Sequence, residues 1–307
     1  MKEDRIISLF AEAEPTSWDD CARIGNFLIT TDSMVEGNHF RLDWSSPEDL
    51  ANKLIQVNFS DIASSGGQPK YCLLNLGLSE ISSSQEWILP FSQEFRKLLA
   101  KYGVQLIGGD TFYSSSTFLN LTVWGELAEG DEPWLRCNAK PKDKLYITGD
   151  LGLSLLGYKI LKKDISKAIP ATLNKESISK HIRPESKLAL IPELRKWKIH
   201  SCMDITDGLI QDAGKLSQIS KTSIQIDLDS LPRIREIGEF LTINEIASSG
   251  EELELLFTTD ENLPKEINGV RITKIGDIIE ESNQPSVSYQ FNGKNYPIQT
   301  SGFEHFS

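Results

Sequence analysis

Residues 27–32 read FLITTD and residues 104–110 read VQLIGGD, and each is an apolar, strand-like run that leads into an aspartate. Open α/β sheets present ligand-binding residues where their strands end. Helix and strand signals alternate along the rest of the chain, which favours an α/β or α+β protein over an all-β sandwich or a helical bundle. The sequence therefore predicts an α/β (α+β) fold with aspartates where strands end.

Local signals predict further elements around these two runs. Ser46-Pro47 predicts a helix start, because Ser46 can cap, Pro47 suits the first turn, and the acids that follow favour the positive end of the helix dipole. A second helix is predicted over 85–101, where apolar residues recur at helical spacing. The predicted strands are 27–31, 71–78, 117–124, 144–148, 223–228, 253–258 and 270–275.

The length of 307 residues suggests two domains, each large enough to bury a core of its own. Between 128 and 143 the sequence becomes polar and carries two prolines, which is typical of a domain boundary. We expect an N-terminal domain at 1–138 and a C-terminal domain at 139–307.

Charge and composition exclude several classes of function. Acidic residues outnumber basic ones by 44 to 32, which gives a net charge of −12, whereas a nucleic-acid groove needs a basic face. No apolar run approaches the ~18 residues of a membrane span, and the first residues lack the apolar stretch of a signal peptide. We therefore expect a cytoplasmic protein with neither a nucleic-acid nor a membrane partner.

The cysteines and histidines, four of each, are dispersed. They form no C-x-x-C pair and no H-E-x-x-H helix, so reduced structural thiols are expected and soft metal ligands are scarce. Any metal would be a hard cation that oxygen atoms hold.

Several aspartates lie beside glycine, serine, threonine or asparagine. For any one of them a turn or an N-cap is the simpler interpretation. As a set they suggest carboxylates that converge on one cleft, where cations must neutralise them. Mg²⁺ binds oxygen ligands and bridges carboxylates to phosphates, so the set predicts phosphoryl transfer. The segments are 18–20, 30–33, 58–61, 108–111 and 204–208.

The common phosphate-binding signatures are absent from the sequence. The nearest approach to a P-loop is Gly152-x₄-Gly157-Tyr158-Lys159, which lacks the required lysine and the Ser/Thr. No G-x-G-x-x-G follows a strand, and neither H-R-D nor D-F-G occurs. Few classes of nucleotide-binding protein have a metal-rich site without a P-loop.

The chain carries, in order, WDDCA (18–22), TTDSMVEGNHF (30–40), NFSDIASSGGQP (58–69), LIGGDT (106–111), RCNAKPKDKLYITGDLG (136–152), MDITDGL (203–209), GEELELLF (250–257) and SGFEHF (301–306). Together these segments resemble the thiamine-monophosphate kinase family, in the superfamily that includes aminoimidazole ribonucleotide synthetase. The resemblance covers essentially the entire chain, and its most specific segment is 30–40.

The resemblance implies ATP-dependent phosphorylation of thiamine monophosphate to thiamine diphosphate by direct in-line transfer, with several Mg²⁺ ions. A requirement for K⁺ is left open. The resemblance also implies a homodimer in which the N-terminal domains, each a mixed sheet with helices, pair strands across the two-fold axis, beside a C-terminal α/β domain.

The same resemblance assigns roles to single residues. Catalysis would rest on Asp32, Asp61, Asp110 and Asp207. The metal ligands would be Asp20, Thr30, Thr31, Asp32, Asp61, Asp110, Asp204 and Asp207. The nucleotide would meet Gly109, Asp110, Arg136 and Thr206, and the thiamine substrate would meet His39, Glu251 and Phe303.

Departures from the family pattern leave alternatives open. Trp18 and Asn138 stand where glycines are usual, Lys187 stands where an arginine is more usual, and Glu252-Leu253 replaces Asp-Tyr. The changes at Trp18 and at Glu252-Leu253 motivate a non-catalytic paralogue that senses nucleotide or thiamine phosphate. Another ATP-dependent synthetase of the superfamily is the second alternative. The complete set of metal-binding aspartates favours an active kinase.

Overall fold

A computed structural model of the chain describes residues 9–10 and 19–298. These residues form two compact units. The N-terminal unit holds 20–133 and also 153–197, and the C-terminal unit holds Asp19, 134–152 and the residues from 198 onward. The domain boundary that we expect at 138/139 stays a prediction. Two residues singled out in the sequence, Trp18 and Phe303, lie outside the described residues.

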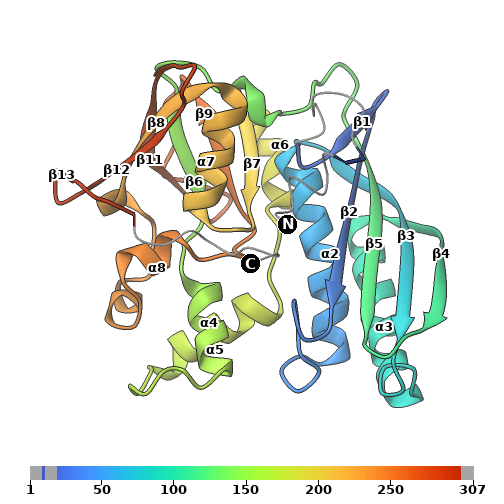
Figure 1. Ribbon diagram of the computed structural model, residues 1–307. Coiled ribbons are helices and arrows are strands. Elements are labelled where there is room, and N and C mark those ends of the chain that lie inside the picture. The colour runs from blue at the N-terminus through green and yellow to red at the C-terminus, as the bar shows by residue number, and fades with distance from the viewer. Residues whose placement is uncertain (1–8, 11–18, 299–307) are drawn as a thin grey trace. The chain divides into compact units, whose positions relative to one another are not determined.

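The N-terminal unit contains a mixed five-stranded sheet in the order β1-β2-β5-β3-β4. β3 and β4 run parallel, and the other neighbours run antiparallel. Helices α2 and α3 cover one face of this sheet (Figure 1). The strands are β1 (Ala22–Ile24), β2 (Phe27–Val35), β3 (Gln68–Leu78), β4 (Gln105–Tyr113) and β5 (Phe118–Glu126).

The two predicted helices of this unit are confirmed. α2 (Pro47–Ser64) begins with a capping box, in which the Ser46 hydroxyl accepts the Asp49 N–H and the Asp49 carboxylate accepts the Ser46 N–H. α3 (Gln85–Tyr102) ends at Gly103, which adopts the left-handed conformation. The core lies between helices and sheet, where alternate residues of β5 are buried against α2. The unit is completed by α4 (Leu153–Leu161), α5 (Ala171–Ile182) and α6 (Ile191–Leu194).

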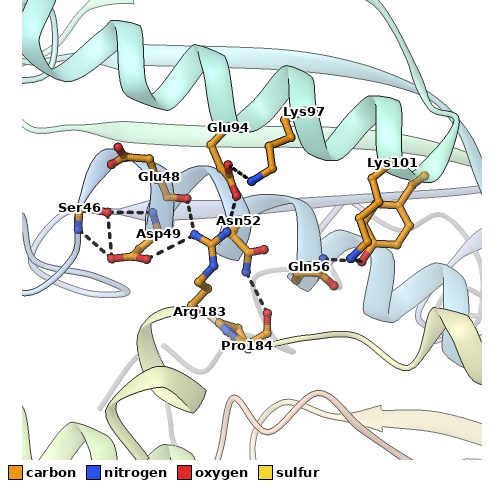
Figure 2. A network of polar contacts seen from close by, with 11 residues as sticks. Ser46, Glu48, Asp49, Asn52, Gln56, Glu94, Lys97, Lys101, Arg183 and Pro184 are labelled. Atoms are coloured by element: carbon orange, nitrogen blue, oxygen red, sulfur yellow. Dashed lines mark hydrogen bonds and ion pairs between the residues drawn. The ribbon is translucent and has the colours of Figure 1, made fainter. Parts of the chain in front are cut away.

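Arg183 ties the end of α5 to α2 and α3 (Figure 2). The helix stops at Ile182 because Arg183 precedes Pro184, a position that disfavours helical dihedral angles. The Arg183 guanidinium forms an ion pair with Glu94 of α3, and its Nη1 lies 3.4 Å from the Asp49 carboxylate of α2. One arginine therefore joins three helices of the N-terminal unit.

Buried amides of α2 hold the chain just after Arg183. Asn52 donates to the Pro184 carbonyl at 3.0 Å, as Figure 2 shows. The Gln56 side-chain oxygen accepts both the N–H and the hydroxyl of Ser186, each at 2.8 Å. Since both amides are almost fully buried, these bonds fix the segment after α5 on α2.

The C-terminal unit contains an eight-stranded sheet in the order β13-β12-β8-β11-β6-β9-β7, with β10 paired to β11. Among the described strands of this sheet, only the pair β12–β8 is parallel. The strands are β6 (Lys144–Thr148), β7 (Ser201–Ile205), β8 (Thr222–Asp227), β9 (Glu254–Thr259), β10 (Glu266–Ile267), β11 (Val270–Glu281), β12 (Val287–Phe291) and β13 (Lys294–Asn295). The helices are α7 (Leu209–Ser220) and α8 (Ile243–Ala247), and short 3₁₀ turns lie at Arg136–Asn138, Leu228–Ser230 and Arg235–Glu239. Both units are thus α/β, as predicted.

The strand ends predicted at two of the candidate aspartates, Asp32 and Asp110, are wrong. β2 continues past Asp32 to Val35, because all nine of its residues pair with β5. β4 runs to Tyr113, so Asp110 lies inside it, opposite Asn75 of β3. Both aspartates therefore project from within strands.

Other features of the described residues agree with the sequence. The four cysteines are free thiols, of which only Cys137 is exposed. Within residues 9–10 and 19–298, no helix combines the length and the apolar composition that crossing a membrane requires.

Candidate active site

Helix α2 brings two of the predicted aspartates together in the N-terminal unit. The Thr30 hydroxyl of β2 donates to the Asp61 carboxylate of α2 at 2.6 Å. The Ser64 hydroxyl, one turn further along α2, donates to the Asp20 carboxylate at 2.5 Å. A carboxylate oxygen of Asp20 lies within 4.8 Å of one of Asp61. Two anions this close repel each other, so the pair favours a cation.

Asp32 lies on the same strand as Thr30, two residues on. Its backbone N–H donates to the side-chain oxygen of Asn58 at 2.9 Å, and the Asn58 amide donates to the Leu54 carbonyl at 2.9 Å. The fully buried Asn58 therefore fixes β2 against α2 at this residue. Because side chains alternate along a strand, Thr30 and Asp32 share the α2 side of the sheet.

Thr31 lies on the opposite side of the sheet from Thr30. Its hydroxyl lies 3.0 Å from the Thr122 hydroxyl and 3.2 Å from the Leu121 carbonyl, to which it donates. The structure therefore does not bring the Thr31 side chain to Asp61.

Gly109 and Asp110 lie on the edge strand β4, where a register shift interrupts the pairing with β3. Gly109 has φ = 150°, and a Cβ there would lie 1.8 Å from the Leu74 carbonyl oxygen. Only glycine fits so close to a neighbouring strand. The adjacent Asp110 is exposed, and its carboxylate accepts the Thr111 N–H at 2.9 Å.

His39 lies in a turn that hydrogen bonds hold from several sides. Its Nδ1 accepts the Val35 N–H at 3.0 Å, so the neutral ring carries its proton on Nε2. The ammonium of the buried Lys53 donates to the His39 carbonyl at 3.3 Å. Glu36 closes the turn, because its carboxylate accepts the Thr117 N–H at 2.9 Å. The imidazole is therefore held in one orientation, half-buried.

Asp204, Thr206 and Asp207 follow one another at the end of β7 in the C-terminal unit. Asp204 is buried within the strand, and Thr206 and Asp207 form a turn just after the strand ends. The carboxylate of Asp212, on the first turn of α7, accepts the N–H groups of Thr206 and Asp207, each at 3.1 Å. The turn needs glycine at its end, since a Cβ on Gly208 would lie 2.7 Å from the backbone of Ser248.

Lys215 contacts both acids of this turn. Its ammonium lies 2.5 Å from the Asp207 carboxylate and 3.1 Å from that of Asp212. Burial raises the pKa of Asp212 to about 6, although the charges of Lys215 and Arg136 oppose that rise. Burial lowers the pKa of Lys215, but Asp212 and Asp207 outweigh it and the net shift is upward, so Lys215 stays cationic.

Glu251 is held beside Thr206 by backbone contacts. Its N–H donates to the Thr206 carbonyl at 2.8 Å, and both Glu251 and Leu253 adopt left-handed φ values, of 55° and 49°. Such conformations cost on the order of 1 kcal/mol each in non-glycine residues. The substituted Glu252 stabilises the bend, because its buried carboxylate accepts the Gly152 N–H at 2.7 Å.

Arg136 is pinned through its backbone. Its N–H donates to the Asp19 carboxylate at 2.6 Å, and its carbonyl accepts the hydroxyls of Ser201 and Ser220. These bonds fix the start of the side chain that the resemblance assigns to the nucleotide.

Sequence reasoning missed several residues that support the predicted ones. Asn58 and Ser64 fall at helical spacing from Asp61 along α2, and Asp212 and Lys215 fall three residues apart on α7. The sequence shows this helical spacing, but the spacing alone does not identify the residue that each of these side chains contacts.

The oxygen atoms around Asp61 suit a hard divalent cation as ligands. The carboxylates of Asp20 and Asp61 and the hydroxyl of Thr30 are all oxygen ligands, as Mg²⁺ requires. Asp207 fits less well, because its carboxylate already holds an ammonium group.

Comparison with known proteins places the chain in a family. Its residues 18–127 match the AIR synthase related protein N-terminal domain, and residues 140–284 match the C-terminal domain of the same description. The thiamine-monophosphate kinase of Leptospira interrogans is 42% identical over 308 residues, which covers 100% of this chain and 98% of the relative. The thiamine-monophosphate kinase of Escherichia coli K12 is 32% identical over 319 residues, which covers 99% and 95%.

Solved structures agree with these relatives. AaThiL complexed with AMPPCP and TMP has a TM-score of 0.84 at 27% identity, covering 99% of this chain and 97% of that chain. Thiamine monophosphate kinase from Aquifex aeolicus has a TM-score of 0.81 at 26% identity, covering 95% of each chain. The chain therefore belongs to the AIR synthase related family and, within it, to the thiamine-monophosphate kinases.

Proposed function

We propose that this chain transfers the γ-phosphoryl group of ATP to the phosphate of thiamine monophosphate, which yields ADP and thiamine diphosphate. The observation that carries the proposal is the likeness along the whole chain to AaThiL with AMPPCP and TMP, an ATP analogue and the phosphate acceptor. The names of the relatives at 42% and 32% identity support the same reaction. ATP as co-substrate favours a cytoplasmic location.

The transfer is a direct in-line displacement. A terminal phosphate oxygen of thiamine monophosphate attacks the γ-phosphorus, and the bond to the bridging oxygen of ADP breaks. Because the attacking oxygen is already anionic, no side chain has to remove a proton. The residues instead hold two anionic substrates in line and compensate their charge.

The carboxylates of Asp20 and Asp61 would hold Mg²⁺, with Thr30 and Asp32 on the same side of β2. Mg²⁺ held there would reverse the local negative charge and supply a positive charge for the phosphate groups of the substrates. The other assignments remain proposals from the resemblance: Thr31, Asp110 and Asp204 as ligands, Gly109, Arg136 and Thr206 at the nucleotide, and His39, Glu251 and Phe303 at thiamine.

The reaction is tested by incubating the full-length protein with ATP, Mg²⁺ and thiamine monophosphate and measuring thiamine diphosphate. Asp61→Asn is expected to lower kcat at least ~100-fold, since it removes a charge that holds the metal. Asp43→Asn is the matched control, because Asp43 is an exposed aspartate paired with Arg41 at 2.9 Å. Replacing K⁺ by Na⁺ in the same assay tests the monovalent requirement.

Two results would contradict the proposal. Stoichiometric binding of both ligands by folded protein without turnover would identify a sensor. An Asp61→Asn variant as fast as the parent would refute the role of the carboxylate pair.

We also propose a homodimer formed through β4. This edge strand is exposed along all nine residues and presents Leu106, Ile107, Phe112 and Tyr113, which are 44–78% exposed. A long apolar edge of this kind pairs readily with another strand. Light scattering at micromolar concentration should give the mass of a dimer, and Ile107→Lys should give a monomer. Ile279→Lys, at a similarly exposed isoleucine in the C-terminal unit, should stay dimeric. A monomeric parent protein would refute the dimer.

A further inference from the structure

The carboxylate of Asp212 is held by groups of the turn after β7 and by Lys215. Asp212 is fully buried, and one of its carboxylate oxygens accepts two backbone N–H groups of the turn. Its other oxygen contacts the Lys215 ammonium at 3.1 Å. Asp212 is therefore fully engaged within the chain.

Lys215 also engages Asp207, at 2.5 Å. The lysine side chain is 36% exposed and the Asp207 side chain 28%, so this pair is only partly screened by water. The Lys215 ammonium thus contacts both carboxylates of the turn and supplies a positive charge between them.

The family resemblance makes Asp207 a metal ligand, and the contacts of this chain disagree with that. A carboxylate that holds an ammonium must release it before it can bind a divalent ion through the same oxygen. The free energy of breaking the carboxylate–ammonium pair therefore lowers the affinity of the carboxylate for the divalent ion.

We propose that Lys215 acts as an internal cation at Asp207, so that its ammonium occupies the place that a divalent ion would take on this carboxylate. The proposal rests on the proposed function, because it concerns the metal complement of the kinase site. In this chain the divalent ions are held by the carboxylates around Asp61, and the Lys215 ammonium supplies the positive charge at the 206–208 turn.

The test measures binding of Mn²⁺ to the full-length protein by electron paramagnetic resonance, without ATP or thiamine monophosphate. It therefore does not depend on whether the protein is a kinase. Lys215→Met removes the ammonium and keeps the apolar stem, and it should make one Mn²⁺ bind about tenfold more tightly than in the parent. Lys215→Arg keeps the charge and should match the parent.

Lys274→Met is the matched control for the change in net charge. Lys274 is an exposed lysine of the same unit, paired with Asp277 at 2.6 Å. Its loss makes the whole chain equally more acidic but leaves Asp207 untouched. Mn²⁺ affinity in this variant should equal that of the parent.

Asp207→Asn tests the proposal even if Lys215→Met fails to fold. An aspartate that already holds an ammonium contributes little to ion binding, so Mn²⁺ affinity should change less than about twofold. Loss of a true metal ligand costs at least the roughly 10- to 100-fold seen when supporting residues are removed. A loss of that size in Asp207→Asn overturns the proposal, and so does folded Lys215→Met that binds Mn²⁺ no better than the parent.

Discussion

Arg183→Met is expected to destabilise the N-terminal unit by about 2 kcal/mol. Its partner Glu94 has a side chain only 9% exposed, whereas that of Arg183 is 34% exposed. Removing one partner of a fully buried pair costs ~3–5 kcal/mol, and an exposed pair contributes less than ~1 kcal/mol. The Arg183–Glu94 pair lies between these limits, and Glu94 keeps Lys97 after the change.

The assay is a double-mutant cycle with Glu94→Gln. Free energies come from urea denaturation, with hydrogen exchange of α3 peptides reporting the N-terminal unit. The interaction energy between the two changes should be about 1.5 kcal/mol. Lys97→Met is the control, because the Lys97 side chain is 72% exposed and its loss should cost less than ~0.5 kcal/mol.

The loss of stability that Arg183→Met causes should also depend on pH. Burial raises the pKa of Glu94, but the hydrogen bonds and charges of Lys97 and Arg183 outweigh burial, so the net shift is downward. A lowered pKa means that the stabilisation is fully present above the unfolded-state value of ~4.3 and is lost as the pH falls through the folded-state value. The Arg183→Met cost should therefore be largest near neutral pH and shrink below about pH 4.

Three results would refute this reasoning. The first is an interaction energy near zero in the cycle. The second is a Lys97→Met variant that costs as much as Arg183→Met. The third is an Arg183→Met cost that does not change between pH 7 and pH 3.

Other substitutions probe single contacts. Gly109→Ala should cost more than ~3 kcal/mol in thermal denaturation, since its Cβ would collide with the Leu74 carbonyl, and an unchanged Tm would contradict the close approach. Asn58→Leu removes two buried hydrogen bonds and should cost about 2 kcal/mol by urea denaturation, with a parent-like midpoint as the contrary result. In thiol labelling Cys137 should react before Cys72, because Cys72 is buried and burial raises its pKa to about 12; the reverse order would contradict the fold.

Helix starts could be predicted from the sequence because their determinants are local. Ser46 and Asp49 bond each other three residues apart, so the capping box of α2 is visible in the letters. The end of β2 could not be predicted in this way. Thr30 and Asp32 look like the close of an apolar run, yet their partners Asp61 and Asn58 lie 31 and 26 residues further along the chain.

The site was predictable to a similar degree. Each aspartate beside glycine or threonine favours a turn on its own, and only the set as a whole indicates phosphate chemistry. The environment of Asp207 could not be anticipated, since a lysine on a helix is ordinarily solvated and Lys215 contacts Asp207 across eight residues. β7 was missed because its five residues are all buried and show no alternation.

The division of the N-terminal unit into two stretches of chain, 20–133 and 153–197, has a consequence for biosynthesis. A ribosome adds roughly 5–20 residues per second, so the sheet and helix α2 emerge seconds before α5 and Arg183. During that interval Glu94, Asn52 and Gln56 have none of the partners that the later stretch supplies. The N-terminal unit therefore cannot complete its packing until residues 153–197 have emerged from the ribosome. By then strand β6 of the C-terminal unit is already outside the exit tunnel.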